Sequence, residues 1–491
     1  MFVCMTACGC DRNGGTDGAA EAIERACDAD PEIITTADGV EFVRTPDSCF
    51  ESLVDWPHEP QYVEIDGLRQ AYVDEGPADG PVVLLLHGQP SWSYLYRKMI
   101  PVLTEAGYRA IAMDHLGTGR SDKPTDIASY SYLGHYDRLL RFIDALGLED
   151  ITLFGQDWGG VFGLRAAGLN PSRFARIAIG DSRLRDIPAG TQLYPPVENP
   201  NESADITPLF ARIPAQQFPF YIGCERRFPF VDRFEDWMIY AMRAESFHPS
   251  EVLEASTWFD LPEDAEAAYD APFPSRIYMA GVRTFPSLIN EQAGVNADAR
   301  AGLIAFERPF VTLWAANDPG GLGTCEVQDD LICNVPGAAG QPHARLPEAS
   351  HFLQDDQGPE IARRLVAFIQ NDPSVLGNHE AVCAEAVASK ADLPRAHQSP
   401  GLPPAECPVD TPNCGDPATY EAHADASAAR TGDFQSSALD PVADGSAMMS
   451  SSGAVPVPGV GVGGGVLLTG LLAGLAYRIA LRRAARQPTR F

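Results

Sequence analysis

The sequence predicts an α/β protein in which a doubly wound, mostly parallel sheet lies between layers of helices and carries an inserted helical cap. Three observations support this prediction. Short apolar runs alternate with amphipathic segments from about residue 55 to 372, the runs end in glycine or a polar residue, and the alternation stops between about 185 and 290. The first two features are typical of parallel strands buried between helices, and the third indicates an insertion.

Five apolar runs are the predicted strands. Each is short and apolar on both faces, as expected where helices cover both sides of a sheet. Amphipathic segments separate them, for example 136–146, where Leu139, Leu140 and Ile143 lie along one face. In such sheets, ligands bind beyond the carboxyl ends of the strands. The five runs are 82–86, 109–113, 151–154, 175–179 and 310–314.

The segment 185–290 is predicted to form the cap. It is rich in Pro, Phe, Tyr and Trp, and its pattern indicates helices and loops without buried strands. A stretch of this length exceeds an ordinary connection between two elements, so we expect it to cover the strand ends. The α/β core then comprises residues 53–184 and 291–372.

Length and charge limit the remaining choices. A chain of 491 residues exceeds what one hydrophobic core usually supports, so one large domain with additional segments is expected. The net charge of −31 argues against a nucleic-acid partner, because phosphate binding needs a basic face. The charge indicates a well-solvated surface.

Residues 1–52 are predicted to be an N-terminal export or linker segment, since they are rich in Gly, Ala, Asp and Glu and carry no sustained period. The opening resembles the end of a bacterial lipoprotein signal, with Met5, Thr6 and Ala7 before Cys8. The basic and long apolar regions of such a signal are missing. Either the true start lies upstream or the resemblance is accidental, and both interpretations stay open.

The C-terminal segments have the composition of a linker and a membrane anchor. Residues 373–454 are rich in Ala, Pro, Asp and Ser, which is typical of a linker. Within 455–491, the uncharged stretch 460–476 precedes five arginines, a pattern typical of a transmembrane helix or a bacterial sorting signal. A buried soluble helix is the alternative. We therefore expect an exported protein of the cell envelope, membrane-anchored on the periplasmic or extracellular side.

The eleven cysteines gather outside the predicted core, and only Cys224 lies between Cys49 and Cys325. Cysteines kept in loops and tails are typical of disulfides in an exported protein. We predict that Cys325 pairs with Cys333 and closes one short loop. The spacings show no paired CxxC or HxxxH motif, so no metal site is predicted.

The central motif is Gly155-Gln156-Asp157-Trp158-Gly159-Gly160, directly after the predicted strand 151–154. A G-x-nucleophile-x-G turn is the nucleophile elbow of the α/β-hydrolase fold, where a strained turn exposes the nucleophile. Aspartate at this place can displace a leaving group from a saturated carbon, and water then cleaves the resulting ester. The alternative role of Asp157 is to cap the following helix.

Two further residues complete a predicted catalytic triad. The fold expects the order nucleophile, acid, histidine along the chain. Asp318 follows the strand 310–314 at the place of the acid, although Asn-Asp-Pro is also a common turn. His351 follows at the place of the base, before a predicted helix at 359–369, although a lone histidine is more often structural.

His87-Gly88-Gln89-Pro90 follows the first predicted strand and is the expected site of the oxyanion hole. The backbone N–H groups of Gln89 and Trp158 would stabilise the oxyanion during hydrolysis of the ester. A plain Gly-Pro turn is the alternative.

The stretch 87–184 resembles the haloalkane dehalogenases, especially the subfamily whose HG-x-P motif has no asparagine at x. The matching blocks are 91–101, 117–124 and 156–160, and the likeness resumes at 271–274, 280–286, 320–323 and 351–352. These blocks are long enough to be specific. The resemblance implies a hydrolytic dehalogenase that acts on a small halogenated molecule and needs no cofactor.

The resemblance also implies that two indole N–H groups hold the departing halide. Trp158, after the nucleophile, matches one of them, and Trp237 in Phe234-Glu235-Asp236-Trp237 of the cap matches the other. An indole is a donor only and cannot compete as a nucleophile. Packing within the core or cap is the alternative role of both.

Two positions depart from the family pattern. Gln89 stands where the family often has Glu or Asn, which leaves the help of its side chain open. Asp181 stands where the family often has Asn, and would add a charge near the pocket. The cap from 185 to 270 is the least similar part.

Two other functions stay open. An epoxide hydrolase, acting on an epoxide substrate, shares the Asp–His–Asp set and needs two cap tyrosines, for which Tyr194, Tyr221, Tyr240 and Tyr269 are available. The context of Asp157 and the Phe-x-x-Trp of the cap favour dehalogenation. A non-catalytic, surface-anchored binding protein on a hydrolase fold is the third possibility, and the intact triad argues against it.

Overall fold

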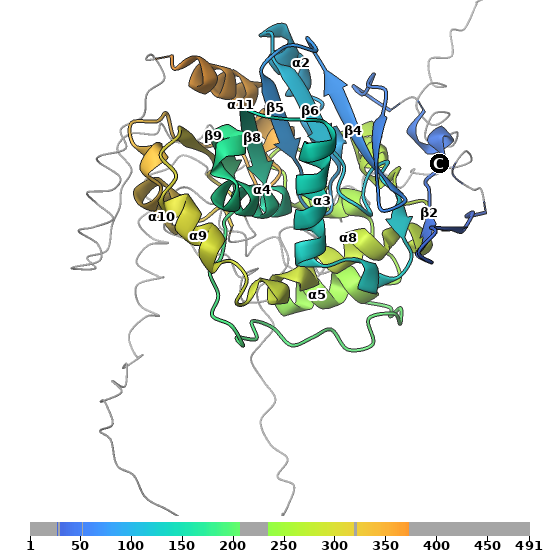
Figure 1. The fold of residues 1–491 in the computed structure, drawn as a ribbon. Coiled ribbons are helices and arrows are strands. Elements are labelled where there is room, and N and C mark those ends of the chain that lie inside the picture. The colour runs from blue at the N-terminus through green and yellow to red at the C-terminus, as the bar shows by residue number, and fades with distance from the viewer. Residues whose placement is uncertain (1–26, 28–29, 52, 207–233, 319–321, 373–491) are drawn as a thin grey trace, which may run out of the picture. The chain divides into compact units, whose positions relative to one another are not determined.

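The computed structural model describes residues 27, 30–51, 53–206, 234–318 and 322–372. At its centre lies an eight-stranded sheet of order β11-β10-β9-β8-β5-β6-β4-β3 (Figure 1). The neighbours from β11 to β6 pair in parallel, whereas β4 and β3 join antiparallel at one edge. The strands are β3 Gln61–Ile65, β4 Leu68–Glu75, β5 Val82–Leu86, β6 Arg109–Met113, β8 Ile151–Gln156, β9 Phe174–Gly180, β10 Phe310–Ala315 and β11 Ala344–Leu346.

Helices cover both faces of this sheet, so the predicted α/β class is confirmed. Side chains alternate between the faces of a strand: on β5, Val83 and Leu85 pack in one core with α2 and α11. Leu84 and Leu86 pack in the other with α3 and α4. The core helices are α2 Ile100–Glu105, α3 Tyr132–Ala145, α4 Asp157–Leu169, α9 Ala297–Ile304, α10 Cys325–Asn334 and α11 Leu353–Gln370.

The amphipathic segment predicted at 136–146 is α3. The helix begins earlier because the hydroxyl of Ser131, its N-cap, accepts the N–H of Gly134 at 3.0 Å. Its apolar face is buried through Leu139, Phe142 and Ile143. The stripe thus faces the sheet, as its spacing predicts.

The inserted segment is helical in its described part, as its sequence predicts. It contains α5 Phe234–Arg243, α6 Pro249–Ala255, α7 Glu263–Asp270 and α8 Ala280–Thr284, with isolated bridges but no named strand among its described residues. Figure 1 shows α5 and α8 across one end of the sheet. The described single turns of 3-10 helix are η1 Asp47–Phe50, η2 Ser93–Tyr96, η3 Ile127–Ser129, η4 Pro171–Arg173, η8 Arg276–Met279 and η10 Pro336–Ala338, and the longer η9 is Phe285–Gln292.

The N-terminal segment differs from the predicted linker, because residues 30–51 are folded onto the core. Strands β1 Ile34–Thr35 and β2 Glu41–Val43 form a small antiparallel sheet with β7 Lys123–Pro124. Cys49 and Phe50 are buried in the core, and Cys49 forms a disulfide with Cys27. Burial of these apolar side chains explains the difference.

The predicted pairing of Cys325 with Cys333 is wrong. The two cysteines lie eight residues apart on helix α10, not in a loop. The rise of an α-helix separates such positions by roughly 12 Å, whereas the Cα atoms of a disulfide lie within about 7 Å. Both sulfurs are disulfide-bonded, and this spacing excludes their bonding to one another.

Several sequence predictions fall on residues that the structure does not describe. These are the lipoprotein-like Cys8, the linker 373–454 and the membrane or sorting segment 455–491. Among the described residues, no helix combines the length and the apolar character that crossing a bilayer requires.

Candidate active site

The nucleophile elbow has the backbone that its sequence predicts. Strand β8 ends at Gln156 and α4 begins at Asp157, whose φ of 50° is in the left-handed region that non-glycine residues rarely adopt. A side chain at Gly159 would place its Cβ 2.1 Å from the carbonyl oxygen of Leu86. The glycine therefore lets the turn pass against β5 and present Asp157 at the strand ends.

Gln89 makes the first contact with the predicted nucleophile. Its backbone N–H donates to Asp157 Oδ1 at 2.8 Å. The loop approaches so closely that a Cβ on Gly88 would lie 2.2 Å from the same oxygen. The side-chain Nε2 of Gln89 donates to Val282 O of α8 at 3.2 Å. The amide therefore ties this loop to the cap, while the backbone faces Asp157.

His351 lies between the two predicted acidic partners. Its Nε2 is 3.6 Å from Asp157 Oδ2, and its Nδ1 is 2.8 Å from Asp318 Oδ2. Asp318 follows β10, and His351 immediately precedes Phe352, the N-cap of α11. The three residues predicted from separate strand ends thus lie in one line.

The electrostatics of His351 reflect this position. Burial alone would lower its pKa, but the charge of Asp318 and hydrogen bonds to Asp157 and Asp318 outweigh burial. Together with the charge of Asp157, they hold the pKa of His351 well above its usual value. A histidine between two carboxylates is thus stabilised in its protonated form.

Asp181 is fully buried beside this line. Burial, and then the charge of Asp318, raise the pKa of Asp181 well above its usual value, which favours the neutral form of this carboxyl group. Its Oδ1 accepts the N–H of Ala315 at 2.9 Å. The surroundings of Asp181 therefore disfavour the charge that the sequence led us to expect near the pocket.

Asp181, Asp318 and His351 also form a group whose spacing could hold a metal ion, with one atom of each within 4.8 Å of the others. His351 Nδ1 is already hydrogen-bonded to Asp318 in that group. The arrangement is accounted for by the triad, and we assign no metal to it.

Sequence reasoning missed two residues that hold the site. Ser182 Oγ donates to the carbonyl oxygen of Asp157 at 2.6 Å. Gln156 Nε2 donates to the carbonyl oxygen of His351 at 2.9 Å and so links the elbow to the base. Gln156 is the last residue of β8 and Ser182 lies two residues after the end of β9, and these positions at strand ends were the available signal.

The two predicted halide-binding indoles belong to different clusters of side chains. Trp158 is buried against Phe162 and Phe285 in the core between sheet and cap. Trp237 is buried in the cap and packs against Tyr240 and Phe247. Their joint action on a halide stays a prediction.

The tyrosines available for epoxide opening have other surroundings. The hydroxyl of Tyr269 donates to Asp355 Oδ2. Tyr240 stacks on Trp237 in the cap cluster, and Tyr194 packs against Phe234. Tyr221 lies outside the described residues. Tyr269 is therefore engaged in a buried ion-pair network instead of facing Asp157.

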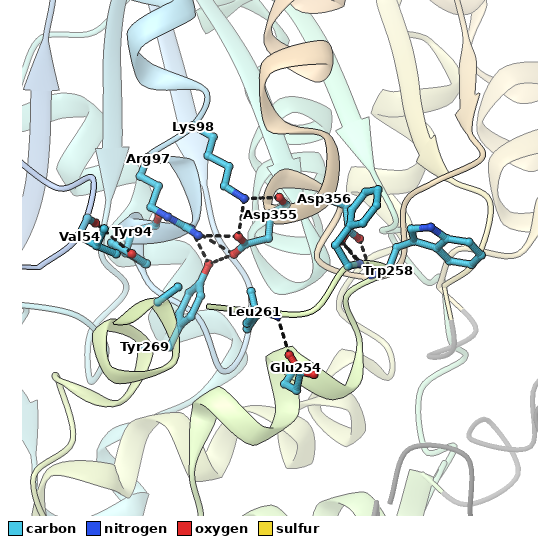
Figure 2. Close-up of polar contacts among 12 residues, drawn as sticks. Val54, Tyr94, Arg97, Lys98, Glu254, Trp258, Leu261, Tyr269, Asp355 and Asp356 are labelled. Atoms are coloured by element: carbon cyan, nitrogen blue, oxygen red, sulfur yellow. Dashed lines mark hydrogen bonds and ion pairs between the residues drawn. The ribbon is translucent and has the colours of Figure 1, made fainter. Parts of the chain in front are cut away.

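That network joins the core to the cap (Figure 2). Arg97 donates through two nitrogens to the carboxylate of Asp355, at 3.1 and 2.6 Å, and both side chains are almost completely buried. Lys98 Nζ lies 3.1 Å from the same carboxylate. Because Asp355 lies in the first turn of α11 and Tyr269 belongs to α7, the network holds the helix that follows His351 against the cap.

Asp356 makes a second link of this kind, also drawn in Figure 2. Its carboxylate accepts the backbone N–H groups of Trp258, Phe259 and Ser350, at 2.8 to 3.0 Å. Ser350 directly precedes His351. The carboxylate therefore fixes the loop of the base to a loop of the cap.

A cluster of buried histidines lies under the oxyanion loop. His87, His115 and His135 are packed together with Phe162 and Phe285. Burial lowers the pKa of His87 to about 4 and those of the other two well below the usual value. All three are therefore neutral at neutral pH.

Comparisons with known proteins agree with this geometry. A family model described as the alpha/beta hydrolase fold matches residues 81–321. A haloalkane dehalogenase of Mycolicibacterium paratuberculosis is 38% identical over 338 residues, which cover 67% of this chain and 98% of the relative. One of Psychrobacter cryohalolentis is 37% identical, over 68% of this chain and 100% of the relative.

Solved structures give the same family. Haloalkane dehalogenase DpaA from Paraglaciecola agarilytica NO2 has a TM-score of 0.54 at 28% identity, and the match covers 67% of this chain and 98% of that chain. The predicted fold and the predicted resemblance are confirmed.

The expectation of an exported, membrane-anchored protein of the cell envelope is corrected. It depended on the terminal segments, but two thirds of this chain already cover the matched haloalkane dehalogenases over 98% or more of their length. The relatives are thus matched without a terminal anchor, and the described residues hold no helix able to cross a bilayer.

Proposed function

Because the chain belongs to the haloalkane dehalogenase family and is a hydrolase acting on carbon–halide bonds, we propose that Asp157 is its nucleophile, His351 its base and Asp318 the acid that supports the base. The protein converts a haloalkane and water into an alcohol, a halide ion and a proton. One observation carries the assignment: His351 Nε2 lies 3.6 Å from Asp157 Oδ2 while its Nδ1 lies 2.8 Å from Asp318.

In the first half-reaction, a carboxylate oxygen of Asp157 attacks the carbon that bears the halogen. The new C–O bond forms as the carbon–halogen bond breaks, and the halide leaves with the bonding electrons. Trp158 lies next to the nucleophile, where its indole N–H is suited to stabilise that anion. We assign the second indole to Trp237 of the cap. The reason is its position as the tryptophan of the Phe-Glu-Asp-Trp segment, which begins α5.

In the second half-reaction, His351 removes a proton from water, and the oxygen of that water attacks the carboxyl carbon of the ester. The oxyanion that forms on Asp157 is stabilised by the backbone N–H of Gln89, which already donates to Oδ1 at 2.8 Å. The N–H of Trp158 is the proposed second donor. Collapse of the intermediate releases the alcohol and restores the carboxylate.

The timing of the base follows from the charges around it. Asp157 contributes to the raised pKa of His351 through a hydrogen bond and through its charge. Formation of the ester removes that negative charge, so the pKa of His351 falls at the step where a neutral base is required. Asp318 keeps its contact with Nδ1 and stabilises the imidazolium that the step produces.

The alternatives are less well supported. Epoxide opening needs two tyrosine hydroxyls over the nucleophile, and the hydroxyl of Tyr269 donates to Asp355 instead. A non-catalytic binding protein has no need of His351 placed between the carboxylates of Asp157 and Asp318. The substrate class we propose is small haloalkanes.

The test is halide release by the full-length protein from 1,2-dibromoethane, 1-bromobutane and 1-chlorobutane. We expect the parent to release bromide and Asp157→Ala to release none. Asp79→Ala, which removes an exposed carboxylate, is the matched control and should keep full activity. Hydrolysis of styrene oxide without halide release would assign the protein to the epoxide hydrolases.

A further inference from the structure

A cavity of about 400 Å³ lies between the segment that leaves β9, helix α9 and the start of helix α10. It is lined by Arg183, Arg185 and Arg300, and by Thr324 at the N-terminus of α10. We call it the arginine pocket. None of these residues has a role in the reaction proposed above.

Among the described residues, two of the three arginines have no counter-charge in contact. The guanidinium groups of Arg183 and Arg185 form neither a hydrogen bond nor an ion pair within this part of the chain, although both residues are partly buried. The only described bond of Arg185 is made by its backbone carbonyl oxygen, which accepts from Asn296 Nδ2 at 2.9 Å. Burial, and then the charge of Arg185, lower the pKa of Arg183 to about 10, and burial also lowers that of Arg185. Partly desolvated guanidinium groups ordinarily pair with an anion, because an unpaired buried charge is costly.

Among the described contacts, no carboxylate that lines the arginine pocket is bonded to Arg183 or Arg185, although the charge of Asp330 acts to raise the pKa of Arg183. Asp330 already accepts from Arg300 Nη2 at 2.6 Å and from Asn334 Nδ2 at 2.7 Å. Asp186 and Glu326 are exposed, and among the described contacts neither is bonded to an arginine. Arg300 keeps one further donor, since its buried Nη1 has no hydrogen-bond partner.

Helix α10 adds a second favourable feature for an anion. Its ten residues begin after Thr324, the N-cap, whose side chain makes no capping hydrogen bond. The N-terminus of a helix carries partial positive charge and free N–H groups, both of which favour an anion. This end of α10 lines the same cavity as the three guanidinium groups.

We propose that the arginine pocket binds an oxyanion, the carboxylate or phosphate group of a small molecule, between Arg183, Arg185 and the N-terminus of α10. The planar guanidinium fork matches the paired oxygens of these groups. The cavity is within the size range of ligand sites, so it accommodates more than a bare ion. The proposal is independent of the dehalogenation assigned above.

The position of the arginine pocket links it to the catalytic centre. Arg183 directly follows Ser182, whose hydroxyl holds the carbonyl oxygen of Asp157 at 2.6 Å. A ligand held by Arg183 therefore stabilises the segment that supports the elbow. Binding of such a ligand to the folded state also raises the unfolding temperature.

The test is titration of the full-length protein with inorganic phosphate, with acetate and with bromide at constant ionic strength, followed by calorimetry and thermal unfolding. We expect saturable binding of phosphate or acetate and a raised unfolding temperature. The oxyanion that binds more tightly identifies the class of ligand. The proposal would be overturned if bromide bound as tightly as phosphate and acetate, or if neither oxyanion showed saturable binding.

Substitution of the pocket arginines tests whether the oxyanion binds in the arginine pocket. In Arg183→Gln/Arg185→Gln the oxyanion should bind roughly tenfold or more weakly. The control Arg363→Gln removes an exposed arginine of α11 and should bind as the parent does. If the double variant fails to fold, each single variant must weaken binding. Unchanged affinity in the folded variants would contradict the proposal.

Discussion

The carboxyl group of Asp181 lies against that of Asp318, and one oxygen of each lies within 4.8 Å of the other and of a ring nitrogen of His351. Both side chains are buried. Burial and the charge of Asp318 raise the pKa of Asp181, which disfavours a second negative charge beside that of Asp318. His351 is hydrogen-bonded to Asp318 of this pair, at 2.8 Å.

This relationship predicts that kcat tolerates substitution of Asp181 but is sensitive to substitution of Asp318. Asp181→Asn replaces a carboxyl group whose neutral form is favoured by a neutral amide of the same shape, so kcat should change by less than about threefold. Asp318→Asn removes the charge that stabilises the imidazolium, and kcat should fall by about a hundredfold or more. Steady-state halide release from 1-bromobutane measures both.

The pH profile distinguishes a neutral Asp181 from a charged one. If Asp181 is neutral, its replacement by Asn leaves the acid limb of kcat in place. A charged Asp181 would help to hold the pKa of His351 up, and the Asn variant would then shift that limb to lower pH. Such a shift would contradict the assignment.

His351→Asn is expected to stop the reaction after the first half. Asp157 can still displace halide, but no base remains to activate water, so the ester should accumulate. Mass spectrometry of the variant incubated with 1,2-dibromoethane should show one added alkyl group on the peptide that contains Asp157, with about one equivalent of bromide released per chain. Normal turnover by the variant would refute the role of His351.

Much of the fold could be predicted because buried parallel strands are short apolar runs, and β5 and β6 have the bounds that their sequences indicate. The antiparallel strands β3 and β4 were not predicted, since they carry polar residues on partly exposed faces. The disulfide assignment failed for a related reason. The pattern of 325–334 does not reveal that these residues form a helix.

Gln89, Asp157 and Asp318 share one signal, their position within three residues after the end of a strand. The charged residues that hold α11 against the cap lack such a signal. Arg97 and Asp355 are 258 positions apart, and charged residues are exposed in most proteins, so neither their burial nor their pairing follows from the sequence. Only the three-dimensional packing of α7, η2 and α11 brings them together.

Removing one member of the buried pair Arg97–Asp355 should lower the free energy of unfolding more than replacing both members by apolar residues. Asp355→Leu leaves Arg97 buried without its acid, and the free energy of unfolding should fall by about 3–5 kcal/mol. Arg97→Met/Asp355→Leu removes both charges and should lose less than the single variant does. Urea unfolding measures both, with Arg141→Ala of an exposed ion pair as a control that should change little.

The order of these stabilities is the decisive outcome. A double variant less stable than Asp355→Leu would mean that the remaining contacts of Arg97, with the Tyr94 ring and the Tyr269 hydroxyl, stabilise the fold by more than its unpaired charge destabilises it.

The buried histidines predict a loss of stability in acid. The folded pKa of His87 is about 4, below its ordinary 6.5, so the unfolded chain binds more protons between these values. The free energy of unfolding should therefore fall as the pH decreases from about 6.5 to 4, by roughly 3 kcal/mol from His87 alone. Urea unfolding at a series of pH values measures the slope.

His87→Gln isolates this contribution. The variant should be less stable than the parent at pH 7 but should lose less stability on acidification, since one titrating group is gone. Equal slopes in the two proteins would exclude His87 as the cause.

The two indoles make the sharpest prediction about the leaving group. Trp158→Phe keeps an aromatic ring against Phe162 and Phe285 but removes the N–H donor, so kcat/KM for 1-chlorobutane should fall at least about tenfold. Trp237→Phe should give a loss of similar size if its indole also donates to the halide.

Trp258→Phe changes an indole of the cap loop held by Asp356 and serves as the control. Bromide quenching of indole fluorescence should weaken in both active-site variants and not in the control. If Trp237→Phe turns over and binds bromide as the parent does, its indole serves only to pack against Tyr240 and Phe247, and the second donor must come from another residue of the cap.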